Sequence, residues 1–228
     1  MLEGKKALII GGTGGTGLEI AKLLLKENCS VYITGRHFPE IFTTEKWQDF
    51  KNKIHFFHTD FSSHNFSFTE EFNAFIKDTN IFCYCFGPFL QKPIHLTTEN
   101  EWRYLSFYNT TFPGILLSKL LPFMIDTSFG RIIFFGGTRT ESVKAYKTNA
   151  PYAACKTALS VLVKSTAAHY SQHNITCNGI LPGFTDNPPQ NTKVTAREFL
   201  ASQALYLLKS SELSGVLLNA DRGWSPLS

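Results

Sequence analysis

Tyr152 and Lys156 are the two residues whose types and spacing could move a proton. They stand four residues apart where a long helical pattern opens after Pro151, and residues at i and i+4 share one helix face. A free phenol titrates at about 10, too high for efficient proton transfer near neutral pH. Because a nearby ammonium favours the phenolate, the pair predicts a tyrosine of lowered pKa that acts as a proton donor. Such pairs also arise by chance, so the surrounding motifs must decide.

A glycine-rich stretch near the amino terminus could bind phosphate. Residues 11–17 read Gly-Gly-Thr-Gly-Gly-Thr-Gly, between an apolar run and a helical pattern. Backbone N–H groups at a helix start and the helix dipole attract anions, and glycine lets a pyrophosphate approach closely. Three motifs fit: G-x-G-x-x-G from Gly12, and G-x-x-G-x-x-G or G-x-x-x-G-x-G from Gly11. The stretch predicts a dinucleotide site without deciding the reaction.

Three further residues follow predicted strands and could contact that dinucleotide. An NAD-binding fold usually carries an acid after the second strand, whereas this chain has Gly35 followed by Arg36. A guanidinium can bind a 2′-phosphate bidentately, so Arg36 favours NADPH over NADH, the alternative being a solvated arginine. Asp60 could accept a bond from the adenine amino group or cap the next turn. Gly87 permits close approach of the backbone to a ligand.

A predicted helix contains Asn109 and, four residues later, Pro113. Proline cannot donate a hydrogen bond to the Asn109 carbonyl, so we expect a kink between the two residues. The alternative is a helix that ends and restarts. A water that joins the Asn109 carbonyl to Lys156 would extend a proton relay.

The elements that must position these residues follow from the pattern of apolar runs. Amphipathic segments alternate with runs rich in β-branched and aromatic residues, at 6–12, 30–35, 53–60, 81–87, 131–137, 174–181 and 215–221. Alternating strands and helices predict an α/β fold, a Rossmann-type doubly wound parallel seven-stranded sheet with helices on both faces. Thr98 with Glu101, and Thr195 with Glu198, predict capping boxes. No repeat or linker divides the chain, so residues 1–228 predict one domain.

Composition excludes several classes of protein. The net charge of +4 comes from basic residues scattered along 228 positions, so we expect neither nucleic-acid nor membrane binding. No apolar stretch reaches membrane-spanning length, and no signal segment precedes the first strand. Five cysteines cannot all pair, and Cys83 and Cys85 suit a buried strand better than a metal site. We therefore expect free thiols, a cytoplasmic location and no metal.

These motifs together resemble the short-chain dehydrogenase/reductase family over nearly the whole chain. The resemblance is to the compact branch that includes the 3-oxoacyl carrier-protein reductases, which often use NADPH. The positions that match the family motifs are Gly11, Gly15, Gly17, Asp60, Asn109, Tyr152, Lys156, Asn178, Pro182-Gly183 and Asp221-Arg222-Gly223-Trp224.

The resemblance implies a mechanism for these residues. Tyr152 would protonate the alkoxide that forms when NADPH delivers hydride to a carbonyl. Lys156 would hold the nicotinamide ribose and lower the tyrosine pKa, and Asn109 would hold a water that links Lys156 to solvent. The predicted cofactor contacts are Gly11, Thr13, Gly15, Thr16, Gly17, Arg36, Asp60, Phe61, Gly87, Tyr152, Lys156, Pro182, Gly183 and Thr185.

The chain departs from the family pattern at the reacting end of the site. Gly136 and Gly137 stand where the family has a serine pair, so only Thr138 or Thr140 could supply a hydroxyl, and we assign Thr138 to catalysis. Residues 84–87 keep only the glycine of the family's Asn-Asn-Ala-Gly, and Ile10 replaces a threonine before the glycines.

The segment 184–194 is too short for the helical lid of the family, and its Pro188-Pro189 pair predicts an extended loop. We therefore expect a wide crevice that suits a bulky or carrier-linked carbonyl substrate, unless another subunit covers it. A homo-oligomer, a dimer or a tetramer, could bring a neighbouring Trp224 over the site.

Two functions compete on these grounds. The first is an NADPH-dependent carbonyl reductase, or the reverse alcohol dehydrogenase. The alternative is a non-catalytic NADP-binding sensor or scaffold, which the missing serine and short lid segment support. The retained Tyr152, Lys156 and Asn109 favour the enzyme, because a binding protein has no need of all three.

Overall fold

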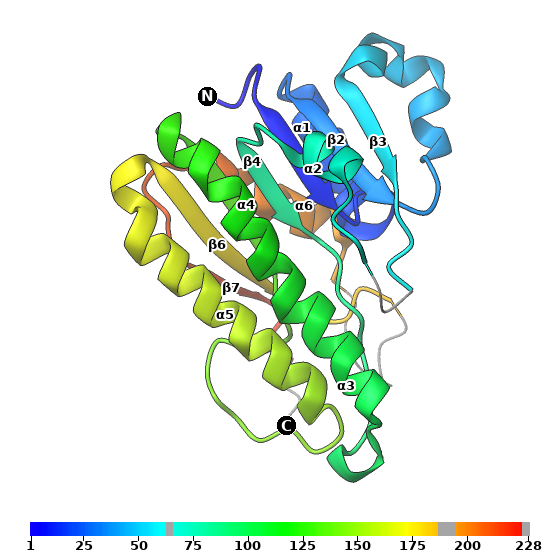
Figure 1. Ribbon diagram of the computed structural model, residues 1–228, viewed down its shortest axis with the longest axis vertical. Coiled ribbons are helices and arrows are strands. Elements are labelled where there is room, and N and C mark those ends of the chain that lie inside the picture. The colour runs from blue at the N-terminus through cyan, green and yellow to red at the C-terminus, as the bar shows by residue number, and fades with distance from the viewer. Residues whose placement is uncertain (63–65, 187–194, 225–228) are drawn as a thin grey trace.

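The computed structural model describes residues 1–62, 66–186 and 195–224, and its centre is one parallel seven-stranded sheet (Figure 1). Every apolar run that predicts a strand forms one, so the predicted Rossmann-type doubly wound sheet is confirmed. The strands are β1 (Lys6–Ile10), β2 (Ser30–Gly35), β3 (Ile54–His58), β4 (Ile81–Tyr84), β5 (Gly130–Phe135), β6 (Ile175–Pro182) and β7 (Leu217–Ala220).

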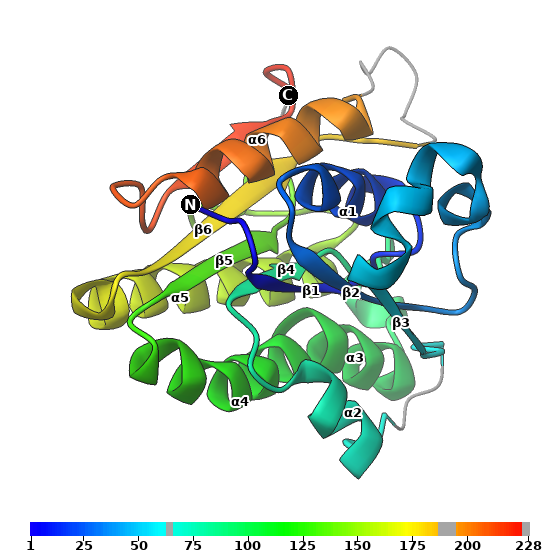
Figure 2. The same cartoon turned by 90° about the horizontal axis from the view of Figure 1, so that it is seen from above.

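Helices cover both faces of this sheet, as Figure 2 shows. One layer holds α1 (Gly15–Lys26) and α6 (Arg197–Lys209), and the other holds α2 (Glu70–Ile76), α3 (Glu99–Ser106), α4 (Phe112–Asp126) and α5 (Ala150–Tyr170). Side chains of a strand alternate between faces, so Ile9 packs into the core cluster beneath α1 and α6 while Leu8 packs into the one beneath α4 and α5. Short 3₁₀ segments span Glu40–Thr43, Glu45–Lys53, Ile94–Leu96 and Ser171–His173.

The strand order β3-β2-β1-β4-β5-β6-β7 reverses its direction of growth between β1 and β4. In such sheets ligands bind in the crevice beyond the carboxyl ends of the strands at this reversal. The glycine-rich stretch follows β1 and Gly87 follows β4, so both lie at this crevice. The fold therefore brings the two ends of the predicted site together.

One of the two predicted capping boxes forms. The Thr98 hydroxyl accepts the Glu101 N–H at 3.3 Å, and the Glu101 carboxylate accepts the Thr98 N–H at 2.8 Å. The prediction of a capping box at Thr195 is wrong, because α6 begins two residues later and has Ala196 as its N-cap. The buried Thr195 hydroxyl donates instead to the Ala220 carbonyl at 3.2 Å, which joins the start of α6 to the end of β7.

The backbone forms a π-helical turn where the sequence predicts a kink. This turn spans Phe107–Thr111 and connects α3 to α4, just before Pro113. In π-helical geometry Pro113 lies at the position that would donate to the Tyr108 carbonyl, and proline has no N–H. The buried Tyr84 hydroxyl donates to that carbonyl. The water link between the Asn109 carbonyl and Lys156 stays a prediction.

Two kinds of feature are absent from the residues that the structure describes. No helix within residues 1–62, 66–186 and 195–224 is long and apolar enough to cross a bilayer. Over the same ranges, no group of three or more histidine, cysteine, aspartate or glutamate residues could hold a metal ion.

Candidate active site

The glycine-rich turn after β1 has the geometry of a phosphate cradle. Gly11 and Gly15 have positive φ angles of 78° and 54°, which disfavour any other residue. A Cβ on Gly17 would collide with the Gly11 carbonyl, so G-x-x-x-G-x-G is the spacing that the backbone requires. The N-cap residue of α1 is Gly14, and among the described residues no side chain caps this end of the helix. The first N–H groups of the helix can therefore bind an anion.

The turn after β2 lies beside this cradle. A Cβ on Gly35 would collide with the Thr13 side chain, so an acidic residue cannot stand there while Thr13 keeps its place. Arg36 is exposed next to Asp60. The Ser62 N–H donates to Asp60 at 2.9 Å, and this bond, aided by the Arg36 charge, lowers the pKa of Asp60. Asp60 therefore caps its own turn in this structure, and its contact with adenine stays a prediction.

Aromatic packing surrounds the next segments of the crevice. The Phe61 ring is buried against Phe86 at a centroid distance of 4.8 Å, and the Phe61 carbonyl accepts the Tyr104 hydroxyl at 2.8 Å. A Cβ on Gly11 would lie 3.2 Å from the Phe86 Cβ, and a Cβ on Gly17 would lie equally close to Cys85. Apolar side chains therefore support the glycine turn where the family has Asn and Ala.

Lys156, Asn109 and Gly87 meet at the carboxyl ends of β4 and β5. The buried Lys156 Nζ donates to the Phe135 carbonyl at 2.8 Å. The buried Asn109 amide donates through Nδ2 to the Pro88 carbonyl at 3.0 Å, while its Oδ1 lacks a hydrogen bond among the described residues. A Cβ on Gly87 would collide with this Oδ1 and lie 2.8 Å from Lys156 Nζ. An unmatched acceptor beside an amine can hold a water.

The protonation of the pair differs from the expectation. Burial raises the pKa of Tyr152 well above its ordinary value, with a smaller contribution from Tyr146, so the expected lowering by Lys156 is corrected. Burial also lowers the pKa of Lys156 to about 8. The Lys156 Nζ is turned to a backbone carbonyl and lies 5.9 Å from the Tyr152 ring centroid, too distant to outweigh burial. Tyr152 is therefore a protonated phenol at neutral pH, the form that donates.

Two cavities converge on this phenol. One, of about 290 Å³, runs from Gly14 past Gly87 to Tyr152 and Lys156, which suits a ligand bound along the glycine turn. The other, of about 690 Å³, is lined by Tyr152 and by Thr138 and Thr140 after β5. Pro182, Thr185 and Asp186 line both, so the end of β6 and the residues that follow it border the two cavities.

A family model described as short chain dehydrogenase matches residues 5–198. The chain belongs to the short-chain dehydrogenase/reductase family. Its members are NAD(P)-dependent oxidoreductases, so this protein is an enzyme of that class.

Several named proteins are similar to this chain in sequence. An uncharacterized oxidoreductase YvrD of Bacillus subtilis is 30% identical over 81% of this chain and 70% of its own. The 3-oxoacyl-[acyl-carrier-protein] reductase FabG of Chlamydia pneumoniae is 28% identical over 81% and 75%. An NADP-dependent (R)-specific alcohol dehydrogenase of Lentilactobacillus kefiri is 28% identical over 89% and 81%. A solved Bacillus thuringiensis structure, described as a candidate 3-oxoacyl-reductase, has a TM-score of 0.85 at 22% identity and covers 97% of this chain and 98% of that one.

Neighbouring side chains leave little room at Gly137, where the short-chain dehydrogenase family carries its serine pair. A Cβ on Gly137 would lie 3.2 Å from the Tyr152 ring and 3.1 Å from the Thr140 side chain. The buried Thr140 hydroxyl donates to the Gly137 carbonyl at 2.8 Å and accepts its N–H at 3.2 Å, which closes a tight turn. The Thr138 hydroxyl donates to the Pro182 carbonyl at 2.7 Å. Both threonines line the larger cavity.

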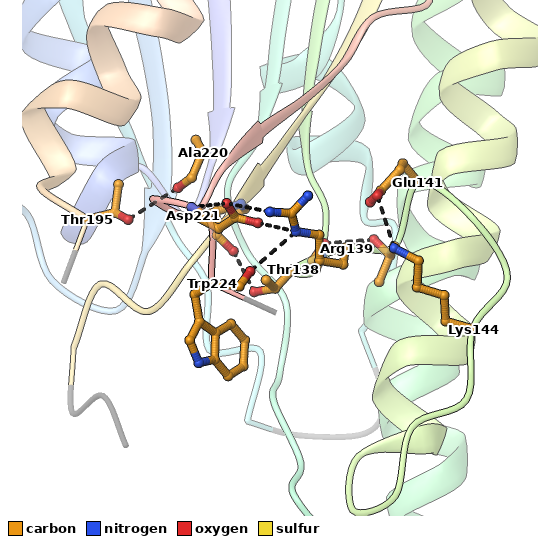
Figure 3. Close-up of polar contacts among 12 residues, drawn as sticks. Thr138, Arg139, Glu141, Lys144, Thr195, Ala220, Asp221 and Trp224 are labelled. Atoms are coloured by element: carbon orange, nitrogen blue, oxygen red, sulfur yellow. Dashed lines mark hydrogen bonds and ion pairs between the residues drawn. The ribbon is translucent and has the colours of Figure 1, made fainter. Parts of the chain in front are cut away.

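An ion pair that the sequence did not indicate joins the ends of β5 and β7 (Figure 3). Arg139, which has a positive φ of 58°, places its Nε 2.7 Å from Oδ2 of the buried Asp221. The same Nε donates to the Trp224 carbonyl at 3.3 Å. Trp224 lines the larger cavity of its own chain, and its expected role as a cover for a neighbouring subunit stays a prediction.

The predicted loop at 184–194 is only partly described. Phe184, Thr185 and Asp186 line the larger cavity, and the Phe184 carbonyl accepts the Thr195 N–H at 2.9 Å. The rest of the predicted extended loop, residues 187–194 with Pro188 and Pro189, lies outside the described residues.

Proposed function

We propose that the protein reduces a carbonyl compound with NADPH, or oxidises the corresponding alcohol. One observation carries the proposal: Tyr152, Lys156, Asn109 and Gly87 meet between a glycine cradle and a larger cavity. A proton donor placed there lies next to both a dinucleotide and a substrate. Oxidation of NADPH, followed by absorbance, with a panel of ketones and oxoacyl thioesters tests the proposal.

The residues of the smaller cavity fit a dinucleotide. Among the described residues no side chain caps the start of α1 after the glycine turn, and position 35 has no room for the acid that an NAD-binding site carries. Bound NADPH would supply the hydride for the carbonyl carbon. The residues that would hold it are the turn Gly11, Thr13, Gly15, Thr16 and Gly17, then Arg36, Asp60, Phe61 and Gly87, and finally Lys156, Pro182, Gly183 and Thr185.

The proton would travel through side chains of this chain. Tyr152 donates its hydroxyl proton to the carbonyl oxygen as negative charge develops there. Lys156, with a pKa of about 8, gives and takes a proton near neutral pH, which suits it to restore the phenol. The unmatched Oδ1 of Asn109 orients the water that connects Lys156 to solvent. Thr138, which lines the larger cavity, is assigned to orient the carbonyl, for which its hydroxyl would turn from the Pro182 carbonyl to the substrate.

Arg36 should set the cofactor preference. Arg36→Gln is expected to weaken NADPH binding about ten- to a hundredfold and to leave NADH binding unchanged, because one charge-assisted bond to the 2′-phosphate is lost. Fluorescence titration of both cofactors measures this. Arg103→Gln is the matched control, since Arg103 is an exposed arginine on α3 that pairs with Glu99. Equal wild-type dissociation constants for NADPH and NADH would contradict the preference.

The two threonines should respond differently to loss of the hydroxyl. Thr138→Val is expected to lower kcat/KM by about tenfold or less, because its hydroxyl only orients the carbonyl during the reaction, and to lower the free energy of unfolding by about 0.5–1.5 kcal/mol through the lost bond to Pro182. Thr140→Val is expected to lower the free energy of unfolding by about 1–3 kcal/mol, because a buried turn loses two hydrogen bonds. Steady-state kinetics and urea denaturation separate the two. If Thr138→Val is harmless and Thr140→Val damages catalysis alone, the assignment of Thr138 is wrong.

We also infer that the substrate is bulky, whether a free small molecule or carrier-linked. A cavity of about 690 Å³ leaves a small ketone touching few of its walls, so little binding energy could reach the transition state. We expect small ketones to show a high KM and larger ones a lower KM.

A homo-oligomer is a further part of the proposal. A groove of about 840 Å³ runs between α4 and α5, with Leu117, Leu121 and Leu162 among its apolar walls. A second copy that presents the same face would bury this groove by two-fold symmetry. We expect a dimer or tetramer by small-angle scattering, and a monomeric mass at micromolar concentration would contradict it.

We infer a cytoplasmic location from the thiols. All five cysteines are free: Cys29, Cys83, Cys85, Cys155 and Cys177. Disulfides are rare where glutathione keeps thiols reduced, so a chain with unpaired and mostly buried cysteines suits that compartment.

A further inference from the structure

We propose that the larger cavity selects carbonyl compounds that carry an aromatic ring and no charge. The inference rests on the proposed carbonyl reduction and names its substrate class. Aromatic side chains from five separate segments line this cavity of about 690 Å³: Phe89, Tyr146, Tyr152, Phe184 and Trp224. So many rings around one space are the strongest chemical feature of the wall.

The rings form two edge-to-face pairs. Phe89 packs on Tyr152 with centroids 4.9 Å apart and planes at 77°, and Phe184 packs on Trp224 at 5.1 Å and 74°. Aromatic rings attract one another in this geometry because the ring edge is positive and the ring face negative. Phe89 is 52% exposed, so part of its ring is open to a ligand. A ring beside Tyr152 can therefore join these pairs.

The charges of the wall disfavour an anion. Among the described residues that line the cavity, Asp186 alone carries a charge, and Arg197 pairs with it. No lysine or arginine of that described lining could meet a carboxylate or phosphate of the substrate. Burying an unpaired anion is costly, so a neutral carbonyl compound fits this wall better.

The Arg139–Asp221 pair holds Trp224 at the cavity. Trp224 is bound through its backbone at both ends, because its N–H donates to the Asp221 carbonyl at 3.0 Å and its carbonyl accepts from Arg139 at 3.3 Å. The Asp221 carboxylate also accepts the Gly223 N–H at 2.9 Å, in a turn where Gly223 has a φ of 80°. Figure 3 shows Arg139 in contact with both Asp221 and Trp224. Arg139 and Asp221 are therefore positioning residues for the indole.

The test measures binding without turnover. Propiophenone, its saturated counterpart cyclohexyl ethyl ketone and the anion 4-propionylbenzoate are titrated calorimetrically into the enzyme, with and without saturating NADP⁺, which cannot donate hydride. Propiophenone is expected to bind about tenfold tighter than the saturated ketone, and 4-propionylbenzoate more weakly than propiophenone. Equal affinity for the two neutral ketones, or tighter binding of the anion, overturns the inference.

Variants of Trp224 and Arg139 test whether the indole causes the tighter binding of propiophenone over the saturated ketone. Trp224→Leu is expected to reduce it to about threefold or less, whereas Trp224→Phe keeps a ring and most of the preference. Arg139→Gln should reduce it in the same direction, and circular dichroism verifies the fold. Trp102→Leu is the control, since Trp102 lies on α3 outside the cavity lining. An unchanged preference in folded Trp224→Leu also overturns the inference.

Failure of this inference and failure of the proposed function look different. If the enzyme reduces ketones without a preference for aromatic ones, the proposed substrate class is wrong and the proposed reductase activity stands. If aromatic ketones bind preferentially but no ketone causes oxidation of NADPH, the aromatic recognition site stands and the proposed reductase activity is wrong.

Discussion

Tyr152→Phe is expected to lower kcat on any confirmed carbonyl substrate by about 10²–10⁴-fold while leaving NADPH affinity nearly unchanged. The variant loses the hydroxyl that donates the proton, but its ring still packs against Phe89. The raised pKa of Tyr152 strengthens this expectation, because the phenol keeps its proton across neutral pH until the substrate oxygen takes it. Steady-state kinetics and cofactor titration on the same preparation measure both quantities.

Tyr146→Phe is the matched control for that substitution. Tyr146 lines the same cavity, and its hydroxyl donates to the Arg139 carbonyl at 2.9 Å rather than facing a reacting group. This variant is expected to lose about 0.5–1.5 kcal/mol of stability and to keep most of its turnover. If Tyr152→Phe keeps most of the wild-type rate, another group must donate the proton.

Lys156→Met is expected to abolish turnover and yet to stabilise the protein without cofactor by about 1–2 kcal/mol at pH 7. Burial lowers the pKa of Lys156 from 10.5 to about 8, which corresponds to a penalty of about 3 kcal/mol for keeping the ammonium inside. Loss of its hydrogen bond to the Phe135 carbonyl offsets part of the gain. Urea denaturation of the two proteins gives the difference.

The pH dependence of that difference follows from the sign of the shift. Below about pH 8 both the folded and the unfolded chain hold the Lys156 proton, so the folded state bears the full penalty. Between about pH 8 and 10.5 the folded chain has released the proton and the unfolded chain has not, so wild-type stability rises with pH relative to Lys156→Met. The advantage of the variant should shrink across this window.

Lys164→Met controls for the removal of a lysine from the same helix. Lys164 lies on α5 and is exposed, so its loss should change neither stability nor the pH profile appreciably. A Lys156→Met protein less stable than wild type at pH 7 would mean that the buried amine stabilises the apo fold, contrary to the account.

The sheet could be predicted because buried parallel strands leave a plain signal. The run at 174–181 corresponds to β6 at Ile175–Pro182, and the run at 131–137 to β5 at Gly130–Phe135. Both faces of such strands are covered by helices, so apolar residues run continuously between polar turns. Alternation of these runs with amphipathic segments leaves few other folds.

Local patterns failed where distant atoms compete for a group. Thr195 has the spacing of a capping residue, but its hydroxyl finds the Ala220 carbonyl across 25 positions of sequence. Spacing likewise brought Tyr152 and Lys156 to one helix face without revealing their burial, which reversed the expected pKa shift of the tyrosine. Tertiary contacts of this kind have no signature in a short window of sequence.

The ion pair and much of the aromatic wall at the larger cavity could not be predicted for the same reason, although Tyr152 and Trp224 were among the candidate residues. Arg139 and Asp221 pair across 82 positions of sequence, and the rings around the cavity come from five segments. Only the fold brings them together. The abundance of phenylalanine, 21 residues, was visible from composition, but composition cannot separate core rings from cavity rings.

Transfer of hydrogen from cofactor to substrate tests the central claim most directly. The enzyme is incubated with propiophenone and NADPH that carries deuterium at the reactive face of the nicotinamide C4, and the alcohol is analysed by mass spectrometry. The account predicts an alcohol with deuterium on the former carbonyl carbon in the wild type and almost none formed by Tyr152→Phe. NADPH that binds tightly but transfers no deuterium to this or any other ketone would contradict the account and leave a binding protein of the same fold.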